Sequence, residues 1–478
     1  MHFPVRRGTG AYAASYGKTM RFPPGRERKA GTALHVSAQC NERIDETMNN
    51  RPEKQTEQEY YLALQERLAD AGETRRTDLL TVLLFLLLVF GFMIAGWLLP
   101  DRSYSEDENR VLQQLPSFSS QPNLSLAERR DAGTLADKLL NGEFAGEFST
   151  YLSDQFPLRD SLVTVKAAVE LALGKKQNAS VTYGSEDWLL TRADYPSQDN
   201  LKTYFEWIDA FAAYAERKNI PTVLAVAGRP VDVMTDKLPA LYPTDTIDKI
   251  WTFADETGGK LAHVTYVNLK NPLAEAKKTT SEQLYYRTDH HWTTFGAYVA
   301  YTALAEPLGF EAKGLDFFTQ ERVSANFRGT VWSTSGMKWV PGEEMYYFRY
   351  AGDMDYTTAV ADGASFAGFY DRSYLETKDQ YGSFLSGNKG YVSVRRNDGG
   401  EDRQKLLVIK DSFAHSLVPF LAIHYDLDIL DLRYYKSIPA ALLKSEEYAG
   451  ILFLANLEYM TDSPESTKLA LMTVGIGD

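Results

Sequence analysis

One uncharged stretch of 21 residues, LLTVLLFLLLVFGFMIAGWLL at 79–99, constrains this 478-residue chain more than any other feature. As an α-helix it would rise ~31 Å at about 1.5 Å per residue, which matches a bilayer hydrocarbon core of about 30 Å. Arg75 and Arg76 precede the stretch, and the acidic residues of 101–108 follow it. Because basic flanks stay in the cytoplasm, the pattern predicts a single-pass transmembrane helix with the N-terminus inside.

Two other interpretations of this stretch stay open, namely a cleaved signal peptide and a buried core helix. The apolar run is longer than the usual hydrophobic region of a signal peptide, and LLPDR is a poor cleavage site. We therefore predict a partly disordered cytoplasmic tail over 1–78, the span, and a polar juxtamembrane linker over 100–131 that is rich in serine. Residues 132–478 form the predicted extracytoplasmic domain. Whether translation starts at Met1 or Met48 stays open.

Charge and cysteine content exclude several classes of partner and site. The net charge is -13, which disfavours nucleic acid, because phosphate neutralisation needs clustered Lys and Arg. Cys40 is the single cysteine, so the chain has neither an internal disulfide nor a thiolate metal cluster. We expect no metal and no cofactor.

Beyond the linker, helical and strand patterns alternate. Amphipathic patterns predict helices over 135–153, 161–173, 198–218, 245–258, 293–308, 413–425 and 437–447. Apolar runs predict strands over 220–228, 263–269, 406–410, 427–432 and 450–456. Buried strands between helices are typical of an α/β fold with a mainly parallel sheet covered on both faces. Residues 316–402 have many aromatics and glycines, and we expect a β-rich insertion at the sheet edge or over the site.

The stretch YYRTDHHWTTFGAY, residues 285–298, carries the most conspicuous chemistry. In an extended segment before a helix, residues i and i+2 point the same way, so Asp289 and His291 would share a side and His290 would point away. A carboxylate beside a ring N–H leaves the other ring nitrogen available as a general base. Alternatively, these residues cap the helix and satisfy one another. A metal site is disfavoured, because adjacent histidines point apart and no second ligand cluster is visible.

A histidine base needs a nucleophile, and the best candidate lies in LLVIKDSFAHSLVPFLAIHY, residues 406–425. The predicted strand ends at Lys410, so Ser412 would lie in a turn at the carboxyl edge of the sheet. Free N–H groups in the first turn of the following helix would stabilise an oxyanion. Alternatively, Asp411 or Ser412 is an N-cap. His415 is another possible partner, although its ring would lean along the helix.

The two motifs, in this order and about 120 residues apart, resemble the DHHW proteins, which belong to the alginate O-acetyltransferase-like branch of the SGNH hydrolase superfamily. The resemblance covers most of residues 100–460 and includes SYSEDENRVL, DQFPLRD, YGSEDWLL, FRGTVWSTSG and DILDLRYY. It implies an SGNH-like three-layer α/β/α fold. It also implies a catalytic triad of Asp289, His291 and Ser412.

The resemblance implies a membrane-anchored, extracytoplasmic O-acyltransferase of the bacterial cell envelope. It would transfer an acyl group, most simply acetyl, to a cell-surface or exported polysaccharide through an acyl-serine. A separate multi-spanning membrane acyltransferase would supply the acyl group, and the lipid bilayer would hold residues 79–99. A carbohydrate esterase and a non-catalytic glycan-binding scaffold are the alternatives. Candidate substrate-binding residues, including Asn456 as a possible oxyanion donor, are His290, Trp292, Arg433, Tyr434, Tyr435 and Asn456.

Overall fold

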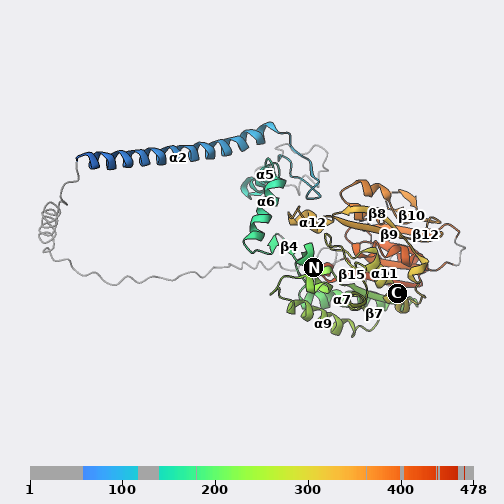
Figure 1. The fold of residues 1–478 in the computed structure, drawn as a ribbon. Helices are drawn as coiled ribbons and strands as arrows, with labels where there is room; N and C mark the ends of the chain where they lie inside the picture. Colours follow the sequence, from blue (N-terminus) through green and yellow to red (C-terminus); the bar gives the residue numbers. More distant parts are fainter. Residues whose placement is uncertain are drawn as a thin grey trace, which may run out of the picture. The chain divides into compact units, whose positions relative to one another are not determined.

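The computed structural model describes residues 57–116, 139–178, 180–361, 363–398, 403–437, 439, 442–460 and 468. The predicted tail before residue 57, linker residues 117–131 and residues 132–138 lie outside this part of the chain. The chain divides into two units, Met1–Gly91 and Phe92–Asp478 (Figure 1).

The described part of the first unit consists of α2, a helix of 42 residues over Glu57–Leu98 whose last residues, 92–98, belong to the second unit. This helix includes the last part of the predicted cytoplasmic tail and the apolar stretch in one continuous element. Within the described residues, Thr77–Leu98 is the one helix segment long and apolar enough to cross a membrane. None of it is buried inside the protein, unlike a core helix.

The second unit is built on a mixed sheet of eight strands, in the order β11-β10-β12-β14-β13-β15-β6-β7 across the described residues. Five strands are parallel to one another, and they are β14 (Asp426–Leu430), β13 (Lys405–Lys410), β15 (Gly450–Asn456), β6 (Thr222–Ala227) and β7 (Thr265–Asn268). The other three strands run antiparallel and come from the region 316–402, and they are β10 (Tyr356–Val360), β11 (Ser365–Ala367) and β12 (Tyr391–Arg396). The prediction of a parallel sheet thus holds for the five strands that carry the helix connections.

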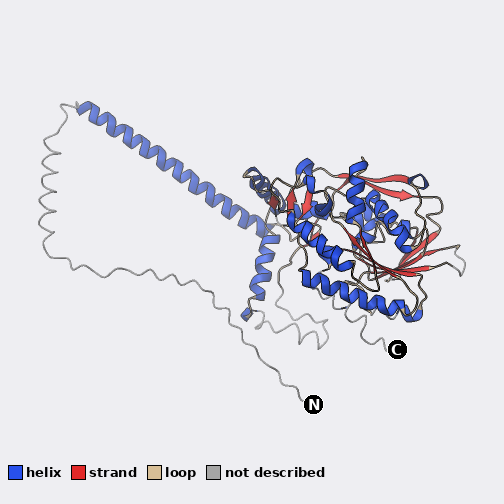
Figure 2. Ribbon diagram, turned by 90° about the horizontal axis from the view of Figure 1, so that it is seen from below, coloured by secondary structure: helices blue, strands red, loops and turns tan. Residues whose placement is uncertain are grey.

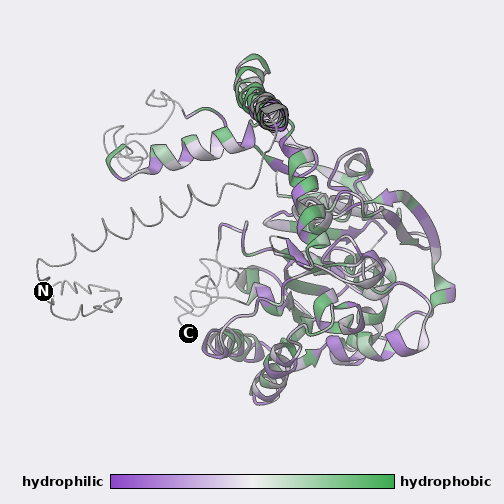
Figure 3. Cartoon of the chain, turned by 60° about the vertical axis from the view of Figure 1, so that its left-hand side comes forward, coloured by the Kyte–Doolittle hydropathy of each residue, from purple (hydrophilic) through white to green (hydrophobic). Residues whose placement is uncertain are grey.

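Side chains of the parallel strands alternate between two hydrophobic cores, one on each face of the sheet. In β13, Leu406 and Val408 enter one core, whereas Leu407 and Ile409 enter the other. This period of two is what a strand buried on both faces requires. Hydrophobic residues accordingly gather in the interior of the domain, and hydrophilic residues lie on its outer loops and helices (Figure 3).

Helices cover both faces, which gives the predicted three layers (Figure 2). The core with Leu407 is covered by α7 (Gln198–Glu216), α9 (Asp245–Gly258) and α14 (Leu442–Ser445). The core with Leu406 is covered by α10 (Lys270–Thr279), α11 (Thr294–Leu308) and α13 (Val418–Leu421). Outside the sheet lie α5 (Glu143–Asp154), α6 (Arg159–Ala172), α8 (Pro230–Val233) and α12 (Thr330–Ser335). Short ladders pair β1 (Tyr104–Ser105) with β2 (Arg110–Val111), β3 (Gln177–Asn178) with β4 (Val181–Tyr183), β4 with β5 (Leu189–Thr191), and β8 (Thr319–Phe327) with β9 (Glu343–Arg349).

One predicted helix is wrong in a way that matters for the site. Residues 413–425 do not form a continuous helix, because the chain makes a single 3₁₀ turn at Ser412–Ala414 and a separate short helix, α13. Pro419 lies at the start of α13, where its missing N–H is tolerated, rather than in a helix interior.

Candidate functional site

The loop that carries Asp289 and His291 is bent rather than extended. An antiparallel bridge between Tyr285 and Trp292 closes it, and the Tyr286 N–H donates to the carbonyl of His291 at 3.2 Å. Within the loop, the backbone N–H of His291 donates to Asp289 Oδ1 at 3.0 Å, which is a local Asx-type turn. Asp289 and His291 therefore point to the same side, as predicted, but this turn brings them together and not an extended strand.

The serine lies at the carboxyl end of β13, between β14 and β15, the edge where open α/β sheets place their sites. Asp411 is the N-cap of the 3₁₀ turn, since its side chain accepts from the Phe413 N–H at 2.9 Å. Ser412 is then the first residue of the turn and is partly exposed. The turn is only three residues long, so the long helix whose first turn was predicted to stabilise an oxyanion does not follow Ser412.

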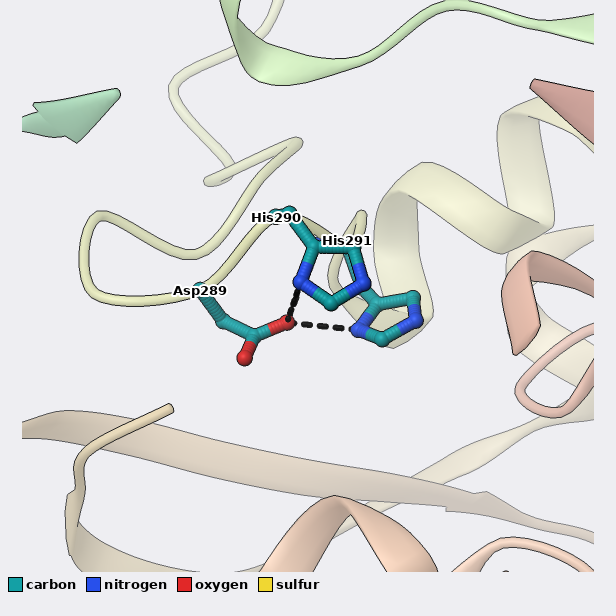
Figure 4. Close-up of side chains that lie close together, drawn as sticks. All are labelled: Asp289, His290 and His291. Carbon is teal, nitrogen blue, oxygen red and sulfur yellow. Dashed lines mark hydrogen bonds and ion pairs between the residues drawn. The ribbon is translucent and has the colours of Figure 1, made fainter. Parts of the chain in front are cut away.

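The structure brings Asp289, His291 and Ser412 into one chain of hydrogen bonds. His291 Nδ1 lies 2.5 Å from Asp289 Oδ1 (Figure 4), and His291 Nε2 lies 2.6 Å from Ser412 Oγ. A carboxylate can only accept, so the ring proton is on Nδ1 and Nε2 accepts the hydroxyl proton. This is the arrangement of a nucleophile, a general base and an orienting acid.

Asp289 is held ionised by its surroundings. It is 1% exposed, and its carboxylate also accepts the N–H and the hydroxyl of Thr330 at 2.7 and 3.0 Å. Burial acts to raise the pKa of Asp289, but the histidine rings beside it and these hydrogen bonds outweigh burial and hold the pKa well below its usual range. A permanent negative charge is thus fixed behind the His291 ring.

His290 does not point away from this network. Its ring centroid lies 3.8 Å from that of His291, and its Nδ1 lies 2.9 Å from Thr330 Oγ1. Figure 4 shows both histidine rings turned toward the same carboxylate oxygen of Asp289, although His290 Nδ1 is 3.7 Å from it. Burial and the neighbouring His291 lower the pKa of His290 to about 4.

These three side chains also place potential metal ligands within 4.8 Å of one another. However, both nitrogens of His291 have protein partners, and His290 Nδ1 contacts Thr330. The donor set therefore fits a hydrogen-bonded triad better than a coordination shell.

A cavity of about 180 Å³ opens over the serine. Its lining includes the cationic side chains Arg328, Lys378 and Arg433, together with Asp379 and His415. Lys378 donates to the carbonyl of Arg328 at 3.0 Å, and burial lowers the pKa of Lys378. Ser412 thus faces a small, polar space with several cationic groups at its walls.

The other residues proposed for substrate binding divide into two groups. His290 and Arg433 line the cavity, and Arg433 is fixed by Asp431 through contacts of 2.9 and 2.6 Å. Trp292 is fully buried, so the prediction of a sugar-binding surface there is wrong. The predicted residues outside the cavity lining are Trp292, Tyr434, Tyr435 and Asn456.

Asn456 has a structural contact in place of the predicted oxyanion role. Its backbone N–H and side-chain amide both donate to Asp411 Oδ2, at 2.8 and 2.7 Å. The backbone N–H of Ser412 itself donates to none of the described residues, which leaves that donor available beside the Ser412 hydroxyl.

Thr330 and Tyr381 were not predicted. Thr330 anchors Asp289, and the Tyr381 ring stacks on His291 with centroids 4.0 Å apart and planes within 9°. Thr330 lies in the stretch FRGTVWSTSG noted above, which was the available signal, whereas nothing local to Tyr381 points to the histidine.

Comparison with known proteins places two family models on this part of the chain. The model described as DHHW protein matches residues 272–428, and the model described as SGNH hydrolase-like domain, acetyltransferase AlgX, matches residues 181–347. The first match includes Asp289, His291 and Ser412. The resemblance inferred from the sequence is thereby confirmed.

Among curated proteins, the chain is similar to the probable alginate O-acetylase AlgJ of Pseudomonas putida, with 27% identity over 172 residues, 35% of this chain and 44% of the relative. The probable alginate O-acetylase AlgJ of Pseudomonas aeruginosa is 24% identical over 179 residues, 37% of this chain and 44% of the relative. The chain thus spans about half the length of the curated relatives it matches.

Among solved structures, PatB1 of Bacillus cereus with a sulfonyl adduct has a TM-score of 0.49 and 17% identity, covering 59% of this chain and 96% of that one. A DHHW family protein from Eubacterium siraeum has a TM-score of 0.48 and 18% identity, covering 61% and 98%. On the sequence, residues 272–428 match the DHHW protein model, and this match overlaps the match to the SGNH hydrolase-like domain of the AlgX acetyltransferase type over residues 272–347.

Proposed function

We propose that this protein is a serine-dependent O-acyltransferase that transfers an acetyl group to a hydroxyl of a cell-surface or exported polysaccharide. The observation that carries the proposal is the hydrogen-bonded chain from Asp289 through His291 to Ser412, with Ser412 on the wall of a cavity. The match to an acetyltransferase domain and the alginate O-acetylase names of the relatives support the reaction class and the polysaccharide acceptor.

In the first half-reaction, Ser412 Oγ attacks the carbonyl carbon of an acyl ester or thioester while His291 Nε2 takes the hydroxyl proton. The carbonyl electrons move to oxygen and form an oxyanion. As they return, the bond to the leaving group breaks, and His291 returns its proton to that group. An acyl-serine remains, and Asp289 stabilises the transient imidazolium throughout.

In the second half-reaction, a sugar hydroxyl is the attacking group, as Ser412 was in the first. His291 removes its proton as the oxygen attacks the acyl-serine, and the proton then returns to Ser412 Oγ as the acyl group leaves. Pockets that enclose whole drug-sized ligands measure about 300–1,000 Å³. The cavity here is about 180 Å³, which suits a short acyl group and the reacting edge of a sugar better than a long acyl chain.

Replacement of Ser412 by alanine tests the chemistry. The full chain in detergent is assayed for release of 4-nitrophenol from 4-nitrophenyl acetate, with Ser149→Ala on the exposed surface of α5 as the matched control. We expect Ser412→Ala to abolish turnover and Ser149→Ala to retain it. Turnover that persists in Ser412→Ala would remove this serine from the mechanism.

An acceptor oligosaccharide separates transfer from hydrolysis. A transferase forms acetylated oligosaccharide, measured by mass spectrometry, and releases less free acetate as the acceptor concentration rises. An esterase releases acetate whether or not acceptor is present, and it deacetylates an acetylated oligosaccharide. A non-catalytic scaffold binds the oligosaccharide with the same affinity in wild type and Ser412→Ala and turns over neither substrate.

Residues 79–99 would anchor the enzyme in the lipid bilayer, with the catalytic domain outside and a multi-spanning membrane acyltransferase as the source of acyl groups. Single-cysteine variants in a Cys40→Ser background test the orientation with a membrane-impermeant maleimide on intact cells. Leu241→Cys, at a fully exposed position of the domain, should be labelled, and Glu66→Cys in the exposed part of α2 should not. The reverse labelling pattern would overturn the orientation. The partner is tested by co-purification. We expect a multi-spanning protein to co-purify with the full chain, and we expect this association to be lost when residues 57–98 are exchanged for an unrelated span.

A further inference from the structure

A second polar chain, separate from the triad, reaches the same cavity. Lys410, the last residue of β13, is buried, and its Nζ lies 3.2 Å from Asp431 Oδ2 and 2.6 Å from His415 Nε2. Asp431 is also fully buried and accepts three hydrogen bonds from Arg433, two from its side chain and one from its backbone N–H. His415 lies at the other end of this chain and lines the cavity over Ser412.

The protonation of this chain follows from its charges. Burial acts to raise the pKa of Asp431, but Arg433 and Lys410 outweigh it, so the pKa of that carboxyl lies below its usual range. Burial lowers the pKa of Lys410, and Asp431 opposes that change. The carboxylate 3.2 Å away favours the ammonium form of Lys410, which can only donate. His415 Nε2 must then accept, and the ring proton is on Nδ1.

The His415 ring is neutral and has one atom without a partner. Burial and Lys410 hold the pKa of His415 well below its usual value. The side chain is 2% exposed, yet Nδ1 has no hydrogen-bond partner among the residues that the structure describes. An unsatisfied buried donor costs about 1–3 kcal/mol, so proteins rarely retain one without a use for it.

Aromatic packing links this ring to the catalytic base. The Tyr381 ring stacks on His291, and the His415 ring lies on Tyr381 with centroids 6.2 Å apart and planes within 16°. The His415 N–H also donates to the Ser412 carbonyl at 3.2 Å, so the residue moves with the nucleophile turn. His415 is therefore held in a fixed position relative to both Ser412 and His291.

We propose that His415 Nδ1–H donates a hydrogen bond to the acyl carbonyl oxygen as it becomes the oxyanion, and that Lys410 and Asp431 hold the ring in the tautomer that can donate. This inference rests on the serine mechanism proposed above, and it assigns a stabilising role that Asn456 does not fill. The backbone N–H of Ser412 is the second donor beside the same oxygen. His415 touches the reacting group, whereas Lys410 is a positioning residue.

The test compares His415→Ala with His415→Asn in the full chain, with 4-nitrophenyl acetate as the probe. Loss of one oxyanion donor lowers kcat by about 10²–10³-fold, so we expect that loss in His415→Ala with KM changed less than threefold. The Asn side-chain amide places an N–H close to the position of the imidazole Nδ1–H, and we expect it to recover at least about tenfold of the lost kcat. Lys410→Met removes the group that fixes the His415 tautomer, and its kcat should lie between those of wild type and His415→Ala. His263→Asn, at an exposed histidine outside the cavity, is the matched control.

A tetrahedral analogue distinguishes oxyanion binding from a structural role. A trifluoromethyl ketone that adds to Ser412 carries a negative oxygen, so its inhibition constant should rise in His415→Ala by about the same factor as kcat/KM falls. If His415→Ala retains wild-type kcat, or if the inhibition constant does not change, the proposal is overturned while the role of Ser412 stands. If wild type is no more active than Ser412→Ala, the serine mechanism fails and this inference fails with it.

Discussion

The indole N–H of Trp292 donates to the backbone carbonyl of Phe413, 121 residues further along the chain, at 3.0 Å. The same N–H lies 2.9 Å from Ser416 Oγ, and the Phe413 ring packs edge-on against the indole. Trp292 follows His291 directly, and Phe413 follows Ser412. One buried side chain thus fixes the backbone next to His291 relative to the backbone next to Ser412.

Trp292→Phe should therefore damage both stability and turnover. It removes the indole donor and leaves the Phe413 carbonyl and Ser416 short of a buried partner, which costs about 1–3 kcal/mol in the free energy of unfolding. Because His291 and Ser412 are then less well held, we expect kcat to fall by about 10–100-fold. Urea unfolding and steady-state kinetics measure the two effects, and Trp97→Phe, in the apolar stretch of α2, is the control. A variant with wild-type kcat would show that this contact does not position the triad.

Asp289→Asn should lower kcat by about 10³–10⁴-fold, because an amide no longer enforces the His291 tautomer or stabilises its cation. It should also destabilise the fold in a pH-dependent way. The folded pKa of Asp289 is depressed, so its contribution to stability is present above the unfolded pKa of about 3.9 and is lost as pH falls below it. The difference in unfolding free energy between wild type and variant should be constant from pH 7 to 5 and shrink below about pH 4. A difference that grows in acid would contradict this assignment.

Gly329→Ala should disable the site without replacing Asp289, His291 or Ser412. The backbone at Gly329 suits any residue, but a Cβ there would collide with the Asp289 side chain. Displacement of the carboxylate by about 1 Å is expected to cost about 10²-fold in kcat. Gly146→Ala in α5, where a Cβ meets nothing within 4 Å, is the control and should stabilise the protein by about 0.5–1 kcal/mol. Equal activities of the two variants would contradict the placement of Asp289 against this glycine.

The acid limb of log(kcat/KM) against pH should be no steeper than a slope of one at any pH above about 5. The general base must be unprotonated to act. The pKa values of Asp289, His290 and His415 all lie below their usual values, so these three groups do not take up a second proton that would steepen the acid limb. Burial raises the pKa of Asp379 in the cavity wall, and Asp379→Asn tests whether it contributes. The slope should stay no steeper than one in that variant. A slope of two in wild type would show that a second group must lose its proton.

Local patterns in the sequence predicted the scaffold well. The strand 450–456 and the helix 245–258 have the bounds expected from their apolar runs, because these signals lie within one element. The helix over 413–425 failed because Pro419 marks a new helix start, and an all-round apolar pattern does not reveal the break.

The pairing of Asp289 with His291 could be predicted, because the two residues are two apart in the chain. The burial of Trp292 could not be predicted, since an aromatic ring suits a sugar-binding surface and a buried core equally well. Thr330 and Tyr381 approach the histidine loop through tertiary packing, and no periodicity within either segment records that contact.

The strands β10 to β12 extend the sheet outward, and the segment that joins β11 to β12 carries Lys378 and Tyr381 to the cavity wall. Part of the mouth of the site therefore belongs to an appended layer, whereas the serine belongs to the parallel core. Substitutions in that layer would reshape the mouth of the cavity without altering the geometry of Asp289, His291 and Ser412, so the proposed acceptor preference and the proposed serine chemistry depend on separate parts of the fold.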